Sequence, residues 1–212
     1  MHLAKKNISN LFKILLIIGF GCFFWLMLKI TLEYIPLQKE VSFLMIKQTE
    51  VEHRPEYLYF FYTHVYTSIF VLLFGFLAIL RKDFGIKNFH QNVGKIYIFL
   101  ILIFSAPSGI YMGIFANGGI LSKVSFVMLG CLWWFSTFKA YQLARQKKFT
   151  LHKQWMWRSF ALTISAITLR MWKVIIVYLF HPNPMDVYQI IAWMGWIPNI
   201  ILIEYLIAKK HL

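Results

Sequence analysis

Charged residues, and acidic residues above all, are scarce in this chain. Only 14% of its 212 residues are charged, with 8 Asp and Glu against 22 Lys and Arg, whereas roughly a quarter of residues are charged in soluble domains. Hydrophobic residues make up 59% of the chain and aromatic residues 19%. This composition excludes an ordinary soluble fold and predicts an all-α integral membrane protein.

Cysteine is also scarce, since Cys22 and Cys131 are the only two. Both lie within hydrophobic segments, so we expect packed thiols and no disulfide. No Cys/His spacing typical of a zinc site occurs. There is also no Ser/His/Asp grouping and no glycine-rich phosphate loop after a strand, which argues against catalysis by an activated nucleophile.

Six hydrophobic segments are each long enough to cross a bilayer, which requires about 20 apolar residues. We place them near residues 11–35, 57–80, 94–116, 121–145, 154–180 and 187–208. The first is preceded by lysines, as in a signal peptide, but its bulky core lacks a small-residue cleavage site, so we interpret it as a retained anchor. Segment 37–56 is too short for a core of its own, and residues 1–212 are predicted to form one transmembrane domain.

Basic residues gather in one set of connections between these segments. That set holds Lys5, Lys6, Lys13, Arg81, Lys82, Lys87, Arg145, Lys147, Lys148, Lys153, Lys209 and Lys210. The opposite set holds Lys39, Lys47, Arg54 and Lys123, against four acids in 37–56. The positive-inside rule therefore predicts a six-helix bundle with both termini in the cytoplasm. The formal charge of +14 is then a topological signal, and we expect the lipid bilayer rather than nucleic acid as partner.

Polar side chains at membrane depth are costly and therefore indicate function. His64 in the second segment and Arg170 in the fifth lie roughly 9–15 Å below the outer surface, at about 1.5 Å per residue. Lys173 follows Arg170 by one turn. We expect these three residues to line an outward-facing cavity for an anionic group or a haem propionate. The alternative is a structural role. The long side chains of Arg170 and Lys173 would then snorkel toward the membrane surface, which we favour for Lys173, and His64 would form a hydrogen bond to a neighbouring helix.

A second polar group lies toward the cytoplasmic side. It consists of Lys95, Arg158 and Glu204, at similar depth in the third, fifth and sixth segments. A carboxylate in lipid needs a partner or must take up a proton. We favour pairing of Glu204 with Arg158 or Lys95 over a proton-relay role.

Small residues mark the middle of the third and fifth segments, in FSAPSGIYMG and ALTISAIT. Pro107 removes a backbone hydrogen bond and predicts a kink. Both segments run in the same direction, and we expect them to pack together.

His90 and His152 open these same two segments in matching contexts, FHQNVGKIYIFL and LHKQWMWRSFAL. Paired imidazoles on neighbouring helices are suited to haem iron, so haem b held by this pair is one hypothesis. Interfacial polar residues or contacts to lipid phosphate are the alternatives. A second haem is not expected, because the only other histidine that could serve as an axial ligand together with His64 is His181, which lies in an external turn.

The strings HxxxGKIY, SAPSG and HKQWMWRSFALTISAITLR together resemble a bacterial membrane family called domain of unknown function 2306. The resemblance covers roughly residues 58–208, and the string after His152 is its most specific part. Lys153 stands where the family usually has arginine. The matching positions are His64, His90, Gly94, Gly109, His152, Trp155, Met156, Arg158 and Arg170. The resemblance implies a multi-pass protein of the bacterial inner membrane and supplies no activity.

Three functions are consistent with these features. The first is a haem-binding redox or electron-transfer protein. The second is a small-molecule transporter or binding protein that uses the His64 and Arg170 cavity, although no inverted repeat with broken segments is evident. The third is an accessory subunit of a partner membrane protein, in which polar residues only fasten helices.

Overall fold

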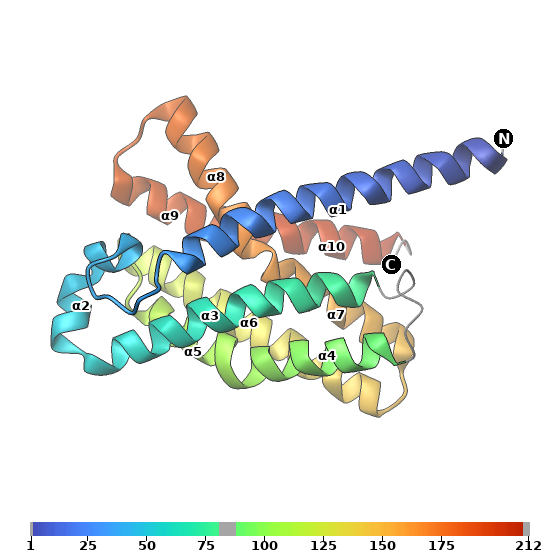
Figure 1. Ribbon diagram of the computed structural model, residues 1–212, viewed down its shortest axis with the longest axis horizontal. Helices are drawn as coiled ribbons and strands as arrows, with labels where there is room; N and C mark the ends of the chain where they lie inside the picture. Colours follow the sequence, from blue (N-terminus) through green and yellow to red (C-terminus); the bar gives the residue numbers. More distant parts are fainter. Residues whose placement is uncertain (1, 81–87, 210–212) are drawn as a thin grey trace.

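The structure is a computed structural model that describes residues 2–80 and 88–209, and within these ranges all regular elements are helical (Figure 1). Six helical stretches are long and apolar enough to cross a membrane, which confirms the six predicted segments. They are Ile14–Leu32, Pro55–Ile79, Phe89–Ile114, Gly119–Arg145, Phe149–Phe180 and Met185–Ala208. Four of the basic residues used to predict orientation, Arg81, Lys82, Lys87 and Lys210, lie outside the described residues.

Three of the six stretches are interrupted. The third consists of α4 (Phe89–Leu100), the π-helix η2 (Ile101–Ser105) and α5 (Ala106–Ile114). The fifth consists of α7 (Phe149–Thr163) and α8 (Ser165–Phe180), and the last of α9 (Pro184–Met194) and α10 (Ile197–Ala208). The other three are continuous: α1 (His2–Leu32), α3 (Pro55–Ile79) and α6 (Gly119–Arg145).

Each interruption has a local cause. Pro107 and Pro198 stand in the first turn of α5 and α10, where their missing N–H costs nothing. No proline lies between α7 and α8; instead Thr163 donates its hydroxyl to the carbonyl of Ser159, and Thr168 donates to that of Ile164. Such back-bonding by Ser and Thr bends helices.

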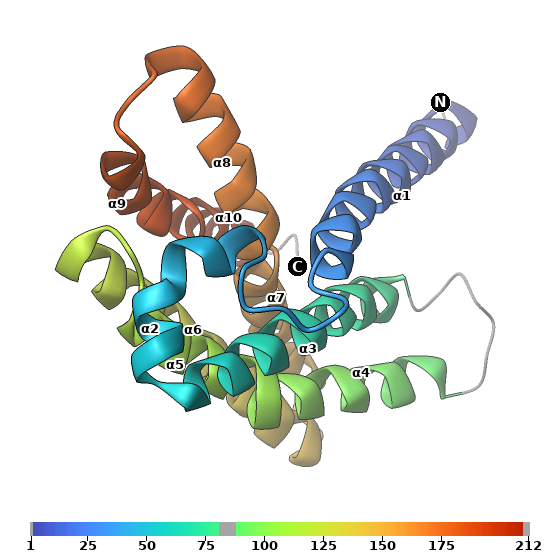
Figure 2. The same ribbon diagram turned by 60° about the vertical axis from the view of Figure 1, so that its left-hand side comes forward.

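The bundle has two distinct ends. In Figure 1 both chain termini lie at one end, together with the start of α7, and the connection from α1 to α3 lies at the other. We call the latter the Tyr34 end. Helix α3 packs against α1, α4 and α5, whereas α6 packs against α5, α7 and α9. Figure 2 shows that α1 and α8 diverge from one another and from the rest of the bundle.

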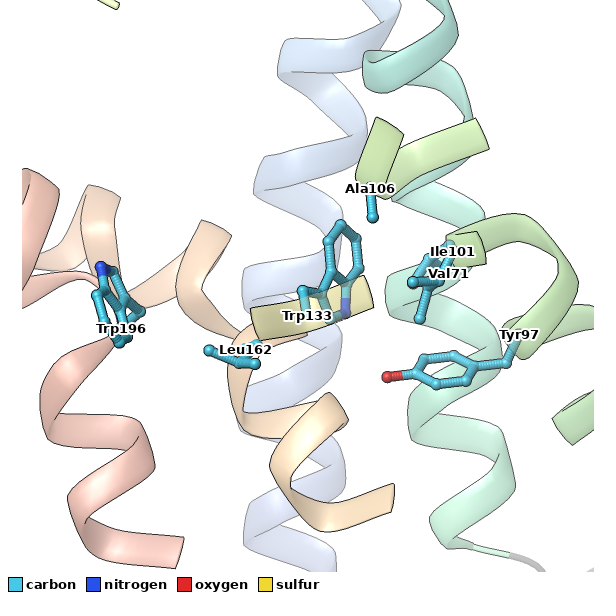
Figure 3. Close-up of a cluster of buried hydrophobic side chains, with 7 residues drawn as sticks. All are labelled: Val71, Tyr97, Ile101, Ala106, Trp133, Leu162 and Trp196. Carbon is cyan, nitrogen blue, oxygen red and sulfur yellow. The ribbon is translucent and has the colours of Figure 1, made fainter. Parts of the chain in front are cut away.

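A hydrophobic cluster joins α3, α4, α6, α7 and the α9–α10 junction. It is made of Val71, Tyr97, Ile101, Ala106, Trp133, Leu162 and Trp196 (Figure 3). Gly75 permits this close packing, because a Cβ there would lie 2.7 Å from Cε2 of Tyr97. The third and fifth segments, which we expected to pack together, meet here.

Tyr97 joins these segments through a buried hydrogen-bond network. Its hydroxyl lies 2.9 Å from Oγ of Ser159 and 2.8 Å from Oγ1 of Thr163. The indole N–H of Trp133 donates to Thr163 Oγ1 at 3.0 Å, and the hydroxyls of Thr137 and Ser159 lie 2.7 Å apart. Hydrogen bonds between helices in a membrane contribute about 0.6 kcal/mol on average and up to about 1.7. The network therefore fixes the relative position of α4, α6 and α7.

Both cysteines are free and exposed. Cys22 and Cys131 lie on surfaces of α1 and α6 that no described element covers, so the packing role expected for them has no support within the described residues.

Candidate functional site

The backbone carbonyls of two residues of the π-helix η2 accept hydrogen bonds from side chains of other helices. In its register the N–H of Ala106 bonds to the carbonyl of Ile101, five residues earlier. Pro107 cannot continue this pattern, and the carbonyl of Leu102 accepts the indole N–H of Trp134 instead, at 3.1 Å. The carbonyl of Ser105 accepts Nδ1 of His64 at 2.8 Å. The carbonyl of Ser105, the last residue of η2, thus fixes the His64 ring.

His64 is half-buried and its ring has one defined tautomer. A carbonyl oxygen can only accept, so Nδ1 carries the proton that it donates to Ser105. The ring lies against Gly109, where a Cβ would be 2.8 Å from Cε1 and 3.0 Å from Nδ1. Among the described residues no group forms a hydrogen bond with Nε2. One turn further along α3, Oγ of Ser68 is buried without a partner, in the described part of the chain.

Arg170 lies in α8, opposite this part of α3. One turn before it, Ile167 packs with Ile69 and Leu72 of α3 and with Met27 of α1. Because the two helices run in opposite directions (Figure 1), Arg170 reaches the level of α3 residues that precede Ile69. Arg170 and His64 thus lie in the same half of the bundle and their charges interact, but no hydrogen bond joins the two side chains.

The guanidinium of Arg170 has a single hydrogen bond, to the carbonyl of Ala166 at 2.8 Å. Its side chain is exposed, and no described carboxylate lies within ion-pair distance of it. Ala166 lies one turn nearer the middle of the membrane span than Arg170, since α8 runs from Ser165 to Phe180 at the Tyr34 end. The side chain therefore turns toward the membrane interior, against the direction of snorkelling.

Two tyrosines complete the surroundings of Arg170. Tyr34, after α1, and Tyr188, in α9, both interact with its charge. The buried Tyr34 hydroxyl accepts the backbone N–H of Phe43 at 3.2 Å, and no described group accepts its proton. Burial raises the pKa of Tyr34, while the bond from Phe43 and the charge of Arg170 act in the opposite direction. We call Tyr34, His64, Ser68, Arg170 and Tyr188 the Arg170 site.

Lys173, the third residue of the predicted cavity, is exposed on α8 and forms no hydrogen bond or ion pair with a described residue. No hydrogen bond or ion pair among the described residues joins it to His64 or Arg170.

His90 and His152 lie in the first turns of α4 and α7. Nδ1 of His90 donates to the carbonyl of Ala78 in α3 at 3.0 Å, and Nδ1 of His152 donates to that of Ala140 in α6 at 2.8 Å. The two rings are therefore held by different helices. Among residues 2–80 and 88–209 no three His, Cys, Asp or Glu side chains form a group that could hold a metal ion.

Arg158 and Glu204 form a bidentate ion pair between α7 and α10. The two hydrogen bonds measure 2.5 and 2.9 Å, and the guanidinium also lies 4.6 Å from the ring centre of Trp155. Arg158 is 19% exposed and Glu204 47%. Lys95 is exposed and separate from this pair.

Sequence reasoning missed Lys47, which is 1% exposed. It lies at the end of the 3-10 helix η1 (Ser42–Lys47), next to α2 (Gln48–His53). Its ammonium group donates to Glu50 at 2.8 Å and to the carbonyl of Phe115. Glu50, three residues after Lys47, was the feature of the sequence that could have indicated an ion pair here.

A groove of about 620 Å³ runs beside α3, on the side of Tyr62 and Tyr66. It is lined by Leu37, Gln38, Lys39, Leu58, Tyr59, Tyr62, Thr63, Tyr66, Thr67 and Phe104. None of the five residues of the Arg170 site lines it.

These features define a multi-pass α-helical membrane protein in which Arg170, within a predicted span, has no carboxylate partner among the residues that the structure describes. The chain belongs to the family described as "Predicted membrane protein (DUF2306)", whose sequence profile matches residues 61–207, and this confirms the family resemblance. No curated protein and no solved structure matches the chain.

Proposed function

We propose that this protein is a membrane-embedded binding protein for an anionic oxygen group, a phosphate or a carboxylate, held at the Arg170 site. The observation that carries the proposal is Arg170 itself: a guanidinium at membrane depth without a carboxylate partner among the described residues. An unpaired charge is expensive in this environment, and such a residue usually marks a ligand site. A bound anion removes that cost.

The chemistry around Arg170 supports an anion rather than a cation. Guanidinium groups bind phosphate and carboxylate oxygens through two parallel hydrogen bonds. Only one hydrogen bond of Arg170, to Ala166, is made within the described residues. The buried hydroxyl of Tyr34 still has its proton to donate. No acidic side chain is among the groups that interact with the charge of Arg170.

We infer that the ligand enters from the side, through the bilayer, as the headgroup of an amphiphile. The side chain of Arg170 is exposed at membrane depth, and α1 and α8 diverge on this side of the bundle (Figure 2). Beyond Lys173, the exposed residues that follow on α8 are apolar or aromatic, among them Val174, Tyr178 and Leu179. They suit contact with acyl chains.

We further propose that residues 1–212 form one domain of the bacterial inner membrane, with both termini in the cytoplasm and the Arg170 site in the outer half. Support comes from the basic residues in the connections at the terminal end, such as Arg145, Lys147 and Lys148. Haem b at His90 and His152 and an accessory role beside a partner subunit stay sequence-based hypotheses. An absorption spectrum after haem-sufficient expression tests the first, and co-purification of a stoichiometric partner tests the second.

The binding proposal is tested by removing the charge of Arg170. The purified protein is mixed with vesicles of phosphatidylglycerol or of phosphatidylcholine, and retained lipid is counted by native mass spectrometry. Wild type should retain the anionic lipid selectively. Arg170→Gln should lower its retention about tenfold or more, as expected for the loss of charge-assisted hydrogen bonds.

Lys173→Gln is the matched control, because it removes an equal charge from the same helix one turn away. It should retain the lipid like wild type. A second experiment adds glycerol 3-phosphate to the purified protein and measures the melting temperature. A saturable rise in melting temperature, without retention of lipid, would show that the ligand is a soluble anion and not an amphiphile. Equal retention by Arg170→Gln and wild type in every arm would overturn the proposal.

A further inference from the structure

The tautomer of His64 restricts what the ligand can be. Its Nδ1 proton is used in the 2.8 Å hydrogen bond to Ser105, so in the neutral ring Nε2 presents only a lone pair. Removal from water within the membrane span favours the neutral form of a histidine that pairs with no described carboxylate. Because Nε2 of a neutral ring repels an anionic oxygen, His64 cannot take part in binding the anion directly.

The packing around His64 holds its ring in the orientation that forms the hydrogen bond to Ser105. Gly109 leaves room for the imidazole at 2.8–3.0 Å from the position of a Cβ. Ser105 itself is fully buried, and its hydroxyl lies 2.7 Å from that of Thr67. The ring is therefore fixed in position and its Nε2 acceptor is preorganised. Among the described residues, nothing forms a hydrogen bond with that acceptor.

We propose that the ligand carries a hydroxyl group next to its anionic group, so that the anion binds Arg170 while the hydroxyl donates a hydrogen bond to Nε2 of His64. This inference rests on the proposed function and names its substrate class: acidic amphiphiles with a hydroxylated headgroup, for which a phosphoglycerol is the simplest example. The buried hydroxyl of Ser68, one turn along α3 from His64, lies without a partner on the same helix face. It supplies a further position for a ligand hydroxyl.

A pair of lipids that differ only in the hydroxyl groups tests this inference. Phosphatidylglycerol and phosphatidylethanol both carry a singly charged phosphodiester, but the ethanol headgroup has no hydroxyl. Wild type in detergent should retain phosphatidylglycerol about tenfold better than phosphatidylethanol, because only phosphatidylglycerol can donate a hydrogen bond to Nε2 of His64. This comparison needs no variant and so does not depend on the folding of one.

Two substitutions assign the preference to His64. His64→Leu removes the acceptor and should lower the retention of phosphatidylglycerol to that of phosphatidylethanol. His64→Gln keeps an amide donor for Ser105 and an oxygen acceptor for the ligand, and should restore part of the preference. Equal retention of both lipids by wild type, or a preference unchanged in His64→Leu, would overturn the inference. If Arg170→Gln retains both lipids like wild type, the proposed function falls instead, and the two failures are thus distinguishable.

Discussion

His90 and His152 donate the same hydrogen bond from equivalent positions of two helical hairpins. Each ring lies in the first turn of its helix, and each Nδ1 bonds to the carbonyl of an alanine twelve residues earlier, Ala78 or Ala140. Each bond joins the end of one helix to the start of the next. The histidines therefore close the hairpins formed by α3 with α4 and by α6 with α7.

The likeness between the two hairpins extends beyond the histidines. The third span is interrupted by η2 at Ile101–Ser105, which begins eleven residues after His90, and the fifth at Ile164, twelve residues after His152. Tyr97 from the first hairpin bonds to Ser159 of the second, and each lies seven residues after its histidine. Two similar units thus meet at equivalent positions, which relates them in parallel rather than as the inverted repeats of many transporters.

Replacement of His152 by Phe should weaken the second hairpin. The variant keeps an aromatic ring but loses the donor to Ala140, and a hydrogen bond of this kind contributes about 0.5–1.5 kcal/mol. We expect the melting temperature in detergent to fall by about 2–4 °C. Lys153→Gln, at the exposed neighbouring position, should melt like wild type. An unchanged melting temperature in His152→Phe would show that the bond contributes nothing.

Arg158 and Glu204 should depend on each other for stability. Either single substitution, Arg158→Gln or Glu204→Gln, leaves the opposite charge unpaired within a membrane span, whereas the double variant removes both charges. We expect the double variant to lose less stability than the sum of the losses in the two single variants. The difference, which is the coupling energy, should be about 1 kcal/mol. Because Glu204 is 47% exposed, a larger value is not expected. Additive thermal-melting data would argue against coupling.

The sequence predicts the six spans and the depth of His64, Arg170 and Glu204, because hydropathy and helical rise are local properties. It does not distinguish Arg158 from Lys95 as the partner of Glu204. That choice depends on how α10 packs against α7, which only the tertiary structure defines.

Lys47 and the η2 π-helix were missed for a related reason. A lysine in a loop is usually solvated, and only the position of the Phe115 carbonyl, 68 residues away, accounts for its burial. Pro107 predicted a kink, but neither the π register nor the hydrogen bond from His64 of α3 to Ser105 can be derived from the local sequence. The sequence therefore indicated His64 and Arg170 as two residues at similar depth. It did not indicate Tyr34, Tyr188 or the tautomer of His64, which define the chemistry of the Arg170 site.

Lys47→Met should release the segment between α1 and α3. The substitution keeps most of the apolar volume but removes the donor to Phe115 and leaves Glu50 without its ion-pair partner. We expect faster cleavage of this segment by a protease specific for acidic residues, at Glu50 or Glu52. Lys39→Met, an exposed lysine in the same segment, provides the control. Equal cleavage rates for wild type and Lys47→Met would contradict the pinning role of Lys47.

Gly109→Ala should displace His64 without touching any ionisable group. The added Cβ would lie 2.8 Å from Cε1 and 3.0 Å from Nδ1 of the ring, so the imidazole must move and its bond to Ser105 is broken or lengthened. We expect a lower melting temperature and loss of the preference for phosphatidylglycerol over phosphatidylethanol. Gly94→Ala is the matched control, since a Cβ there meets nothing within 4 Å, and alanine favours a helix by about 1 kcal/mol over glycine. It should melt at or above the wild-type temperature with lipid preference intact. If Gly109→Ala also kept wild-type stability and preference, the position of the His64 ring would not be what determines binding.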